Sequence, residues 1–302
     1  MATDILKEAP QWAVERESNF HKKHMDEGAL IPFELLSPYD QKRQKGRWRA
    51  YAYTLDDPKR AYVYGAAVSL VGQHASKYDS YTLVDLGAGN GQNTVKTATM
   101  INTIAPHLVS RFYLVEQSGP ALDEAKKLFN RNGFKSSTQF LQEDITGTTL
   151  SSESMDAVTI VNVWHHLSSW EKLQASAMEI DRILKPGGLF VVVDTRPLPS
   201  TGFRRRIIEG KIRGAVSFEN FLERAQREGL DLDEAEKAGM KDFCKHDAFK
   251  AFENALTKGQ FEETLKKSAL APSLQEMGDL RSSHPFFRFV YPSLNIAWGI
   301  KK

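Results

Sequence analysis

The sequence predicts an α/β protein built around a mostly parallel β-sheet, and three observations support this prediction. A glycine-rich segment at 84–92 directly follows a short apolar run. Apolar, β-branched runs then alternate with helix-like stretches, as expected of β-α-β units. Two further β-like runs, 284–291 and 294–301, are separated only by Pro292 and Ser293. Because a parallel crossover needs a dozen or more residues, this last pair is expected to be antiparallel.

The glycine-rich segment is typical of a turn that binds a nucleotide cofactor. Residues 84–92 read VDLGAGNGQ and contain Asp85, Gly87, Gly89 and Gly91. Glycine permits a sharp turn and a close approach of the backbone to a ligand. The helix expected after it would direct its free N–H groups at that ligand. The third glycine comes one residue earlier than in the G-x-G-x-x-G of dinucleotide folds, which disfavours a hydride-transferring dehydrogenase.

Acidic residues end the next two predicted strands. Residues 111–116 read RFYLVE and end at Glu116, one β-α-β unit after Asp85. A nucleotide-binding sheet places a carboxylate at this position against ribose hydroxyls. After a helix-like stretch, residues 138–145 form a third short strand that closes with the acidic pair Glu143 and Asp144. These acids are therefore expected at one edge of the sheet.

Together these features resemble the class I methyltransferases, which use S-adenosylmethionine (SAM) and release S-adenosylhomocysteine. The glycine segment is similar to motif I of that family, and residues 183–188 (ILKPGG), before an apolar strand ending at Asp194, are a further mark of it. The resemblance spans residues 84–194. It implies a doubly wound, mostly parallel seven-stranded sheet with an antiparallel C-terminal hairpin, to which helical cap segments are added.

The resemblance also implies a SAM site. In the family, the residue corresponding to Asp144 hydrogen-bonds the adenine amino group, and its neighbour Ile145 lies against the ring. The residues expected to bind the cofactor are Asp85, Gly87, Gly89, Gly91, Glu116, Gln117, Asp144, Ile145 and Asn162.

Residues 162–167 (NVWHHL) are similar to the segment after strand four in many small-molecule methyltransferases. The SAM sulfonium is already activated, so the protein mainly aligns the nucleophile and excludes water. His165 and His166 are the candidate catalytic residues, because histidine titrates near neutrality and can accept a proton. The alternative is that this turn only packs and supports the cofactor. Trp164, Tyr51 and Arg204 are the residues expected to contact the acceptor.

Two segments outside the core are expected to set the acceptor. The predicted divisions are an N-terminal helical segment at 1–78, a SAM-binding core at 79–194, a helical insertion at 195–281 and a hairpin at 282–302 that completes the sheet. The insertion is too long for an ordinary connection and is expected to be a folded cap. Because ligands of open α/β sheets bind at the carboxyl ends of the strands, both segments are expected to cover the site. The alternative is that they form packing or oligomer surfaces.

Composition excludes several other classes. The chain has 302 residues, with 40 Lys and Arg against 38 Asp and Glu, so nothing indicates a polyanion-binding surface. Cys244 is the only cysteine, which excludes an intramolecular disulfide and favours a reducing compartment such as the cytoplasm. No stretch approaches a membrane-spanning length. The adjacent histidines lack the spacing of metal ligands, so no metal is expected.

The absence of two motifs and the family resemblance restrict the class of acceptor molecule. The segment after strand four lacks the Asn/Asp-Pro-Pro-aromatic signature of amino methylation on nucleobases and glutamine, and there is no Pro-Cys nucleophile. A small-molecule acceptor remains, methylated on oxygen, nitrogen or carbon. Basic runs at 42–49 and 204–213 keep an RNA methyltransferase as an alternative, although a nucleic-acid partner is not favoured. A second alternative is a non-catalytic SAM-binding protein. The oligomeric state stays open.

Overall fold

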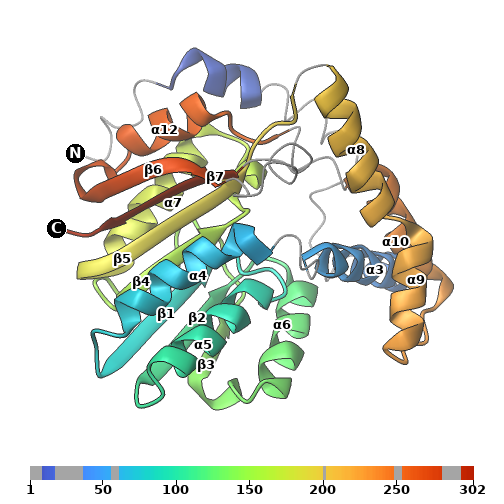
Figure 1. The fold of residues 1–302 in the computed structure, drawn as a ribbon, viewed down its shortest axis with the longest axis horizontal. Coiled ribbons are helices and arrows are strands. Elements are labelled where there is room, and N and C mark those ends of the chain that lie inside the picture. The colour runs from blue at the N-terminus through green and yellow to red at the C-terminus, as the bar shows by residue number, and fades with distance from the viewer. Residues whose placement is uncertain (1–8, 18–36, 56–60, 200–201, 248–253, 281–293) are drawn as a thin grey trace.

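The computed structural model of the chain describes residues 9–17, 37–55, 61–199, 202–247, 254–280 and 294–302. At its centre lies a seven-stranded β-sheet. Its strands span Ser80–Leu86 (β1), Val109–Val115 (β2), Thr138–Leu141 (β3), Met155–Val161 (β4), Leu184–Thr195 (β5), Leu274–Leu280 (β6) and Leu294–Ile300 (β7). Their order is β3-β2-β1-β4-β5-β7-β6 (Figure 1). The strands β1 to β5 are parallel and β7 is antiparallel to its two neighbours, which confirms the predicted fold class.

Hydrophobic layers cover both faces of the sheet. Successive side chains of a strand point to opposite faces, so Leu83 of β1 lies in one layer and Val84 in the other. One layer is closed by α4 (Ala61–Ala75), α5 (Gln92–Ile104) and α6 (Gly119–Arg131), and the other by α7 (Trp170–Ile183) and α12 (Lys258–Lys266) (Figure 1). Short helical turns lie at Lys135–Ser137 (η3), Trp164–His166 (η4) and Ala271–Ser273 (η6).

Capping residues in the sequence explain where three of these helices begin. The Ser118 hydroxyl accepts the Ala121 N–H at the start of α6, and Ser169 does the same for Lys172 at the start of α7. Thr257 begins α12 in a reciprocal capping box. Each cap satisfies an N–H group that has no partner inside the helix.

The partner of the last strand differs from the predicted one. The sequence predicts a hairpin made from 284–291 and 294–301, but β7 pairs with β6, and residues 284–291 lie outside the described part of the chain. The strand β6 forms the edge of the sheet and carries Glu276 and Asp279 among its apolar residues. Charged residues are common on edge strands because they discourage pairing with other chains. Because of these charges, residues 274–280 do not form the apolar run that predicts a strand.

The structure also shifts the boundaries of the predicted core at 79–194. The helix α4 falls in the predicted N-terminal cap, yet its Val71 is fully buried in the first layer against the sheet. The helix α12 falls in the predicted insertion, yet its Phe261 and Leu265 are buried in the second layer. Both helices are therefore part of the core, because their apolar faces pack on the sheet.

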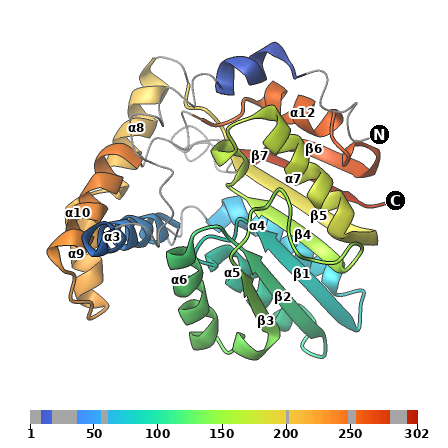
Figure 2. The same ribbon diagram turned by 180° about the vertical axis from the view of Figure 1, so that it is seen from behind.

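Residues 11–17 form a short helix beside α12, whereas four further helices form a separate lobe. It consists of α3 (Pro38–Leu55), α8 (Phe203–Ala215), α9 (Phe218–Arg227) and α10 (Glu234–Asp242), followed by a π-helical turn, η5 (Phe243–Asp247). These helices share a hydrophobic cluster of their own that includes Ile208, Phe221 and Met240. Figures 1 and 2 show the lobe beside the core. The strand β5 begins near the C-terminus of the chain and runs toward the lobe. The lobe thus stands on the side of the carboxyl ends of the parallel strands.

Two glycines and three ion pairs join α3 to α10. A Cβ added to Gly46 would overlap the carbonyl group of Glu236, and one added to Gly239 would overlap that of Arg43. The helices therefore touch backbone to backbone. The ion pairs that flank this crossing are Lys42–Asp233 (2.7 Å), Arg43–Asp242 (2.6 Å) and Arg49–Glu236 (3.3 Å).

We predict that Gly46→Ala loosens the lobe, because the new methyl group can only be accommodated if α3 and α10 move apart. Overpacking of this kind costs about 1–3 kcal/mol. Hydrogen exchange of peptides from residues 203–247 should accelerate, while peptides from β1 and β4 keep their protection. Gly210→Ala in α8 is the matched control, since nothing lies within 4 Å of its added Cβ. Equal exchange in the two variants would show that the close crossing is not needed.

Candidate active site

The glycine loop between β1 and α5 shows why its glycines are needed. Gly87 and Gly91 have φ angles of 76° and 75°, in the left-handed region that favours glycine. A Cβ on Gly87 would lie 2.5 Å from the side chain of Val163, and one on Gly91 would lie 3.0 Å from Leu114 and Phe129. The loop is thus pressed between the turn after β4 and the first hydrophobic layer.

Within the loop itself, the N–H groups of Gly87, Ala88 and Gly91 donate to backbone carbonyl oxygens. The N–H groups that can meet a ligand are therefore those of the first turn of α5. Gly91 is the N-cap of α5, and among the described residues no side chain caps this helix. Uncapped N–H groups at a helix start attract the negative end of a ligand.

Asp85 lies beneath the loop. Its carboxylate accepts the hydroxyl groups of Thr94 in α5 (2.5 Å) and Thr159 in β4 (2.9 Å), and its side chain is 3% exposed. Burial raises the pKa of Asp85 to about 6, although the two hydroxyl donors act in the opposite direction. Both carboxylate oxygens are engaged inside the protein, so Asp85 shapes the cofactor loop from below.

Glu116 follows β2 and faces the loop. One carboxylate oxygen accepts the Gly89 N–H (3.0 Å), and the other accepts the N–H of Ser118 (2.9 Å) at the start of α6. Burial raises the pKa of Glu116, and these backbone donors partly offset that effect. Each oxygen has a second lone-pair position, so the carboxylate can still accept hydroxyl groups from a ligand.

The acids after β2 and β3 meet through a side-chain amide. Gln117 donates from Nε2 to Oδ2 of Asp144 (2.5 Å), while Oδ1 of Asp144 accepts the N–H (2.9 Å) and hydroxyl (2.8 Å) of Thr146. Ile145 is 5% exposed and packs into the second hydrophobic layer. The structure therefore brings Glu116, Gln117 and Asp144 to one edge of the sheet, together with the glycine loop.

The two histidines of η4 have different environments. His165 is 2% exposed, and its Nδ1 lies 2.6 Å from Oδ1 of Asp194, at the end of β5. His166 is exposed, with its ring centroid 4.0 Å from that of His165. The turn begins at Val163, the residue that contacts Gly87, so both rings lie on a segment in contact with the glycine loop.

Arg16 holds this turn from outside. Its guanidinium donates to the carbonyl oxygens of Leu167 (2.5 Å), Trp164 (3.2 Å) and His165 (3.4 Å). It also donates to the carbonyl oxygen of Asn254 before α12. Nearby, Trp12 donates to Glu263 (2.7 Å) and packs edge-on against Trp170. The segment 9–17 is therefore fixed against η4 and α12.

Of the three residues expected to contact the acceptor, Trp164 alone has a side chain within the described part of the structure. Trp164 is fully buried and packs against Phe261 of α12 at a ring-centroid distance of 5.6 Å, so it is a core residue and not an acceptor contact. The backbones of Tyr51 and Arg204 place them on α3 and α8 of the lobe, while their side chains lie outside the described part of the structure. Asn162 adopts a φ of 58° and donates its N–H to Val193, which turns the chain at the end of β4.

Sequence reasoning missed two residues here. Asp194 was assigned only to the end of a strand, although it repeats the pattern of Asp85 and Glu116, an acid directly after a buried apolar run. That pattern was sufficient to find it. Arg16 had no such signal, since an isolated arginine in a polar segment resembles a solvated charge.

Residues of this site fit SAM. The first turn of α5 offers N–H groups without a side-chain cap, Glu116 offers a fixed carboxylate, and Asp144 offers carboxylate oxygens at the same edge of the sheet. No group of three or more potential metal ligands occurs within the described ranges. Likewise, no helix in these ranges is both long and apolar enough to cross a membrane.

Comparison with known proteins agrees with this geometry. Residues 84–192 match the family of methyltransferase domains. The chain is 28% identical, over 130 residues, to the uncharacterized methyltransferase YodH of Bacillus subtilis; the match covers 42% of this chain and 50% of YodH. The chain thus spans about half the length of the curated relative it matches.

Solved structures share the fold at low identity. A SAM-dependent methyltransferase from Aquifex aeolicus superimposes with a TM-score of 0.51 at 13% identity, covering 84% of this chain and 98% of that one. The plantazolicin methyltransferase BpumL, solved with S-adenosylhomocysteine, gives 0.50 at 13% identity, covering 86% and 95%. The fold is that of a class I methyltransferase. Residues 84–192, which match the family of methyltransferase domains, contain the end of β1, the strands β2 to β4 and most of β5.

We predict that Asp85→Asn changes how stability depends on pH. The pKa of Asp85 is about 6 in the folded protein against an ordinary 3.8, so the folded state holds the proton longer. The contribution of protonated Asp85 to the stability of the fold is therefore fully present below pH 4 and is lost as pH rises through about 6. Between pH 4 and pH 7, the free energy of unfolding of the variant should rise by on the order of 2 kcal/mol relative to that of the wild type. Urea unfolding at both pH values measures this. Asp123→Asn on the exposed face of α6 is the control, and a constant difference between wild type and Asp85→Asn would contradict the prediction.

Proposed function

We propose that this protein transfers a methyl group from SAM to an oxygen, nitrogen or carbon atom of a small-molecule acceptor. The observation that supports this best is the contact between Glu116 and the glycine loop. Its carboxylate accepts the Gly89 N–H, so the ribose-binding acid and the loop that would face the cofactor form one unit. The solved neighbour BpumL is, by its description, a methyltransferase for plantazolicin, which favours a small acceptor.

Different residues would bind different parts of SAM in this reaction. Gly87, Gly89 and Gly91 allow the cofactor to approach the backbone, and Glu116 with Gln117 would hold the ribose. Asp144 would bind the adenine amino group. When bound, SAM supplies a methyl carbon activated by its sulfonium. The protein then has to align the acceptor and exclude water, and His165 or His166 would accept a proton where the acceptor must lose one.

The lobe is the part of the chain best placed to bind the acceptor. It stands toward the carboxyl ends of the parallel strands, where ligands of open α/β sheets bind (Figures 1 and 2). Tyr51 on α3 and Arg204 on α8 would contribute to that surface. Since α3 precedes the parallel strands in the sequence and α8 follows them, the acceptor would be held by two segments that meet only in the folded protein.

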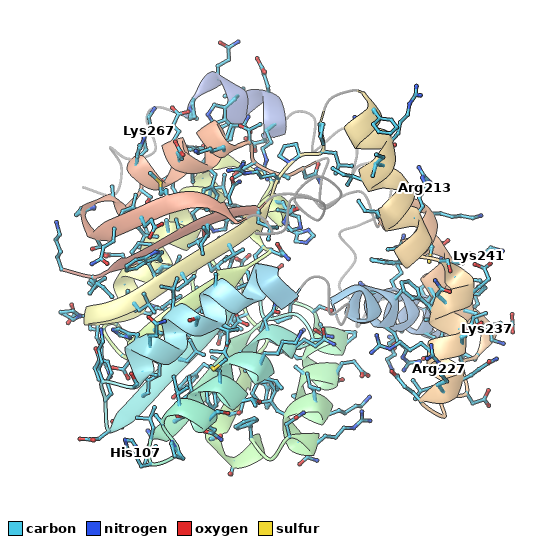
Figure 3. All side chains as sticks on the ribbon, viewed as in Figure 1. His107, Arg213, Arg227, Lys237, Lys241 and Lys267 are labelled. Atoms are coloured by element: carbon cyan, nitrogen blue, oxygen red, sulfur yellow. The ribbon has the colours of Figure 1, made fainter. Side chains whose placement is uncertain are left out.

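An RNA acceptor is the second candidate, and the structure weakens it. Lys42 and Arg43 of the first basic run pair with acids of α10, and Arg205 pairs with Glu209 (2.7 Å). These cations already serve contacts within the lobe. Figure 3 shows further basic side chains on the outer side of the lobe, turned away from the core: Arg213, Arg227, Lys237 and Lys241. RNA bound to that side would not be directed to the SAM site.

We predict that Glu116→Gln weakens S-adenosylhomocysteine binding by about 10- to 100-fold, as expected for the loss of charge-assisted hydrogen bonds. Isothermal titration measures this, and thermal unfolding checks that the variant is folded. Glu124→Gln is the control, because Glu124 lies on the exposed side of α6 and pairs only with Lys127 in the described structure. Titration with NAD should give no heat.

Transfer of labelled methyl from SAM into small-molecule extracts and into RNA then separates the alternatives. Label in the small-molecule fraction supports the proposal. Label in RNA, with an uptake that falls steeply with salt, would favour an RNA methyltransferase. Binding of S-adenosylhomocysteine without any transfer would favour a SAM-binding protein without catalysis. No binding in the wild type would overturn the SAM site itself.

A further inference from the structure

The contact between His165 and Asp194 fixes the form of the imidazole. Nδ1 of His165 lies 2.6 Å from Oδ1 of Asp194, and both side chains are almost fully buried. A carboxylate can only accept hydrogen bonds, so Nδ1 carries the proton. In a neutral ring the lone pair then lies on Nε2. The same Oδ1 accepts the Thr195 N–H (2.8 Å), which holds the carboxylate in place.

Arg16, which lies in the segment 9–17, contacts the turn that carries His165. It binds the carbonyl oxygens of the turn that carries His165, and its charge interacts with that of Asp194. Burial lowers the pKa of Arg16, while Asp194 acts in the opposite direction. The charged and titratable groups that the described residues place around His165 are Asp194 from β5, His166 from its own turn and Arg16 from the segment 9–17.

We propose that His165 is the catalytic proton acceptor of this enzyme and that Asp194 and Arg16 are its positioning residues. This inference rests on the function proposed above and deepens it. Asp194 selects the tautomer and stabilises the imidazolium that forms, as an acid does in other His–Asp pairs. Arg16 holds the turn against the core, so that the ring cannot swing away from the carboxylate.

The proton balance of the step is simple. As the nucleophile forms its bond to the methyl carbon, the carbon–sulfur bond breaks and its electron pair stays on sulfur. The proton of the nucleophile passes to Nε2 of His165. The imidazolium then carries one positive charge beside the negative charge of Asp194, and later releases its proton to water. No oxidant, reductant or metal is required.

The location supports this role over a purely structural one. The turn that carries His165 contacts Gly87 of the cofactor loop through Val163. A buried structural histidine needs no carboxylate partner at the ligand edge of the sheet, and a carboxylate there is costly to bury without function. Asp194 is fully buried, and its Oδ2 has no hydrogen-bond partner among the described residues.

The assignment also narrows the acceptor. A base is needed only where the attacking atom bears a proton that must leave, as in a hydroxyl, a phenol, an N–H group or an acidic C–H. We therefore expect acceptors of this class, and we expect that blocking the same atom with a methyl group abolishes transfer.

The first test reads the tautomer in the intact, full-length protein. With 15N-labelled histidine, two-bond couplings show by NMR which ring nitrogen carries the proton, and the spectrum of His165→Gln identifies the His165 signals. We expect protonation at Nδ1 with and without S-adenosylhomocysteine. A proton at Nε2 would overturn the proposal. This readout needs no turnover and no variant of Asp194.

The second test compares variants in labelled-methyl transfer from SAM into the extract fraction that accepts label. Asp194→Asn and His165→Gln should each lower kcat by about 10²-fold or more, the usual size of a general-base contribution. The dissociation constant for S-adenosylhomocysteine should stay within about threefold. The acid limb of the pH–rate profile should disappear in His165→Gln. Arg16→Lys, which keeps the charge but loses the fork of donors, should give an intermediate loss.

Matched controls separate the outcomes. Asp123→Asn on α6 and His107→Gln before β2, far from the site (Figure 3), should keep wild-type turnover. If Asp194→Asn binds S-adenosylhomocysteine and turns over within threefold of the wild type, the inference fails while the proposed function stands. Loss of turnover in His166→Gln but not in His165→Gln would also overturn it. A wild type that neither binds S-adenosylhomocysteine nor transfers label would instead remove the function on which it rests.

Discussion

The buried carboxylate of Asp85 is the constraint on which the site depends. It joins three elements at one point, because it lies in β1 and accepts hydroxyl groups from Thr94 in α5 and Thr159 in β4. Its burial is unfavourable for the charge, which raises its pKa to about 6, and the two hydroxyl donors offset part of that penalty. The glycine loop spans the short gap between β1 and α5. Its shape is therefore set from below by Asp85 and from the side by Val163.

The core, and the grouping of the glycine loop with the acids after β2 and β3, were largely predictable because their signals are local. Glycine spacing, an acid after each apolar run and the ILKPGG turn lie within short stretches of sequence, and the structure confirms the order of elements that they indicate. Glu116 illustrates this, since a strand ending in a carboxylate is visible in six residues. The contact of Glu116 with the Gly89 N–H is the spatial result of that local pattern.

What escaped prediction depends on contacts between distant segments. Trp164 looked like an acceptor contact because it precedes the histidines, but α12 covers it, and the position of α12 cannot be inferred from the residues around Trp164. The strand β6 was missed because an edge strand tolerates charges. Arg16 bonds to carbonyl groups about 150 residues further along the chain, a kind of contact that leaves no periodic pattern.

The crossing of α3 and α10 has a consequence for how the chain reaches its native state. Arg43 and Asp242, which pair across it, are separated by 199 positions in the sequence. During synthesis, α3 would leave the ribosome long before its partner exists, and all five parallel strands are made in the interval. Contacts of such long range form late, because the intervening chain must first be ordered. The five parallel strands can therefore assemble first, and the lobe forms only after α8, α9 and α10 have been made.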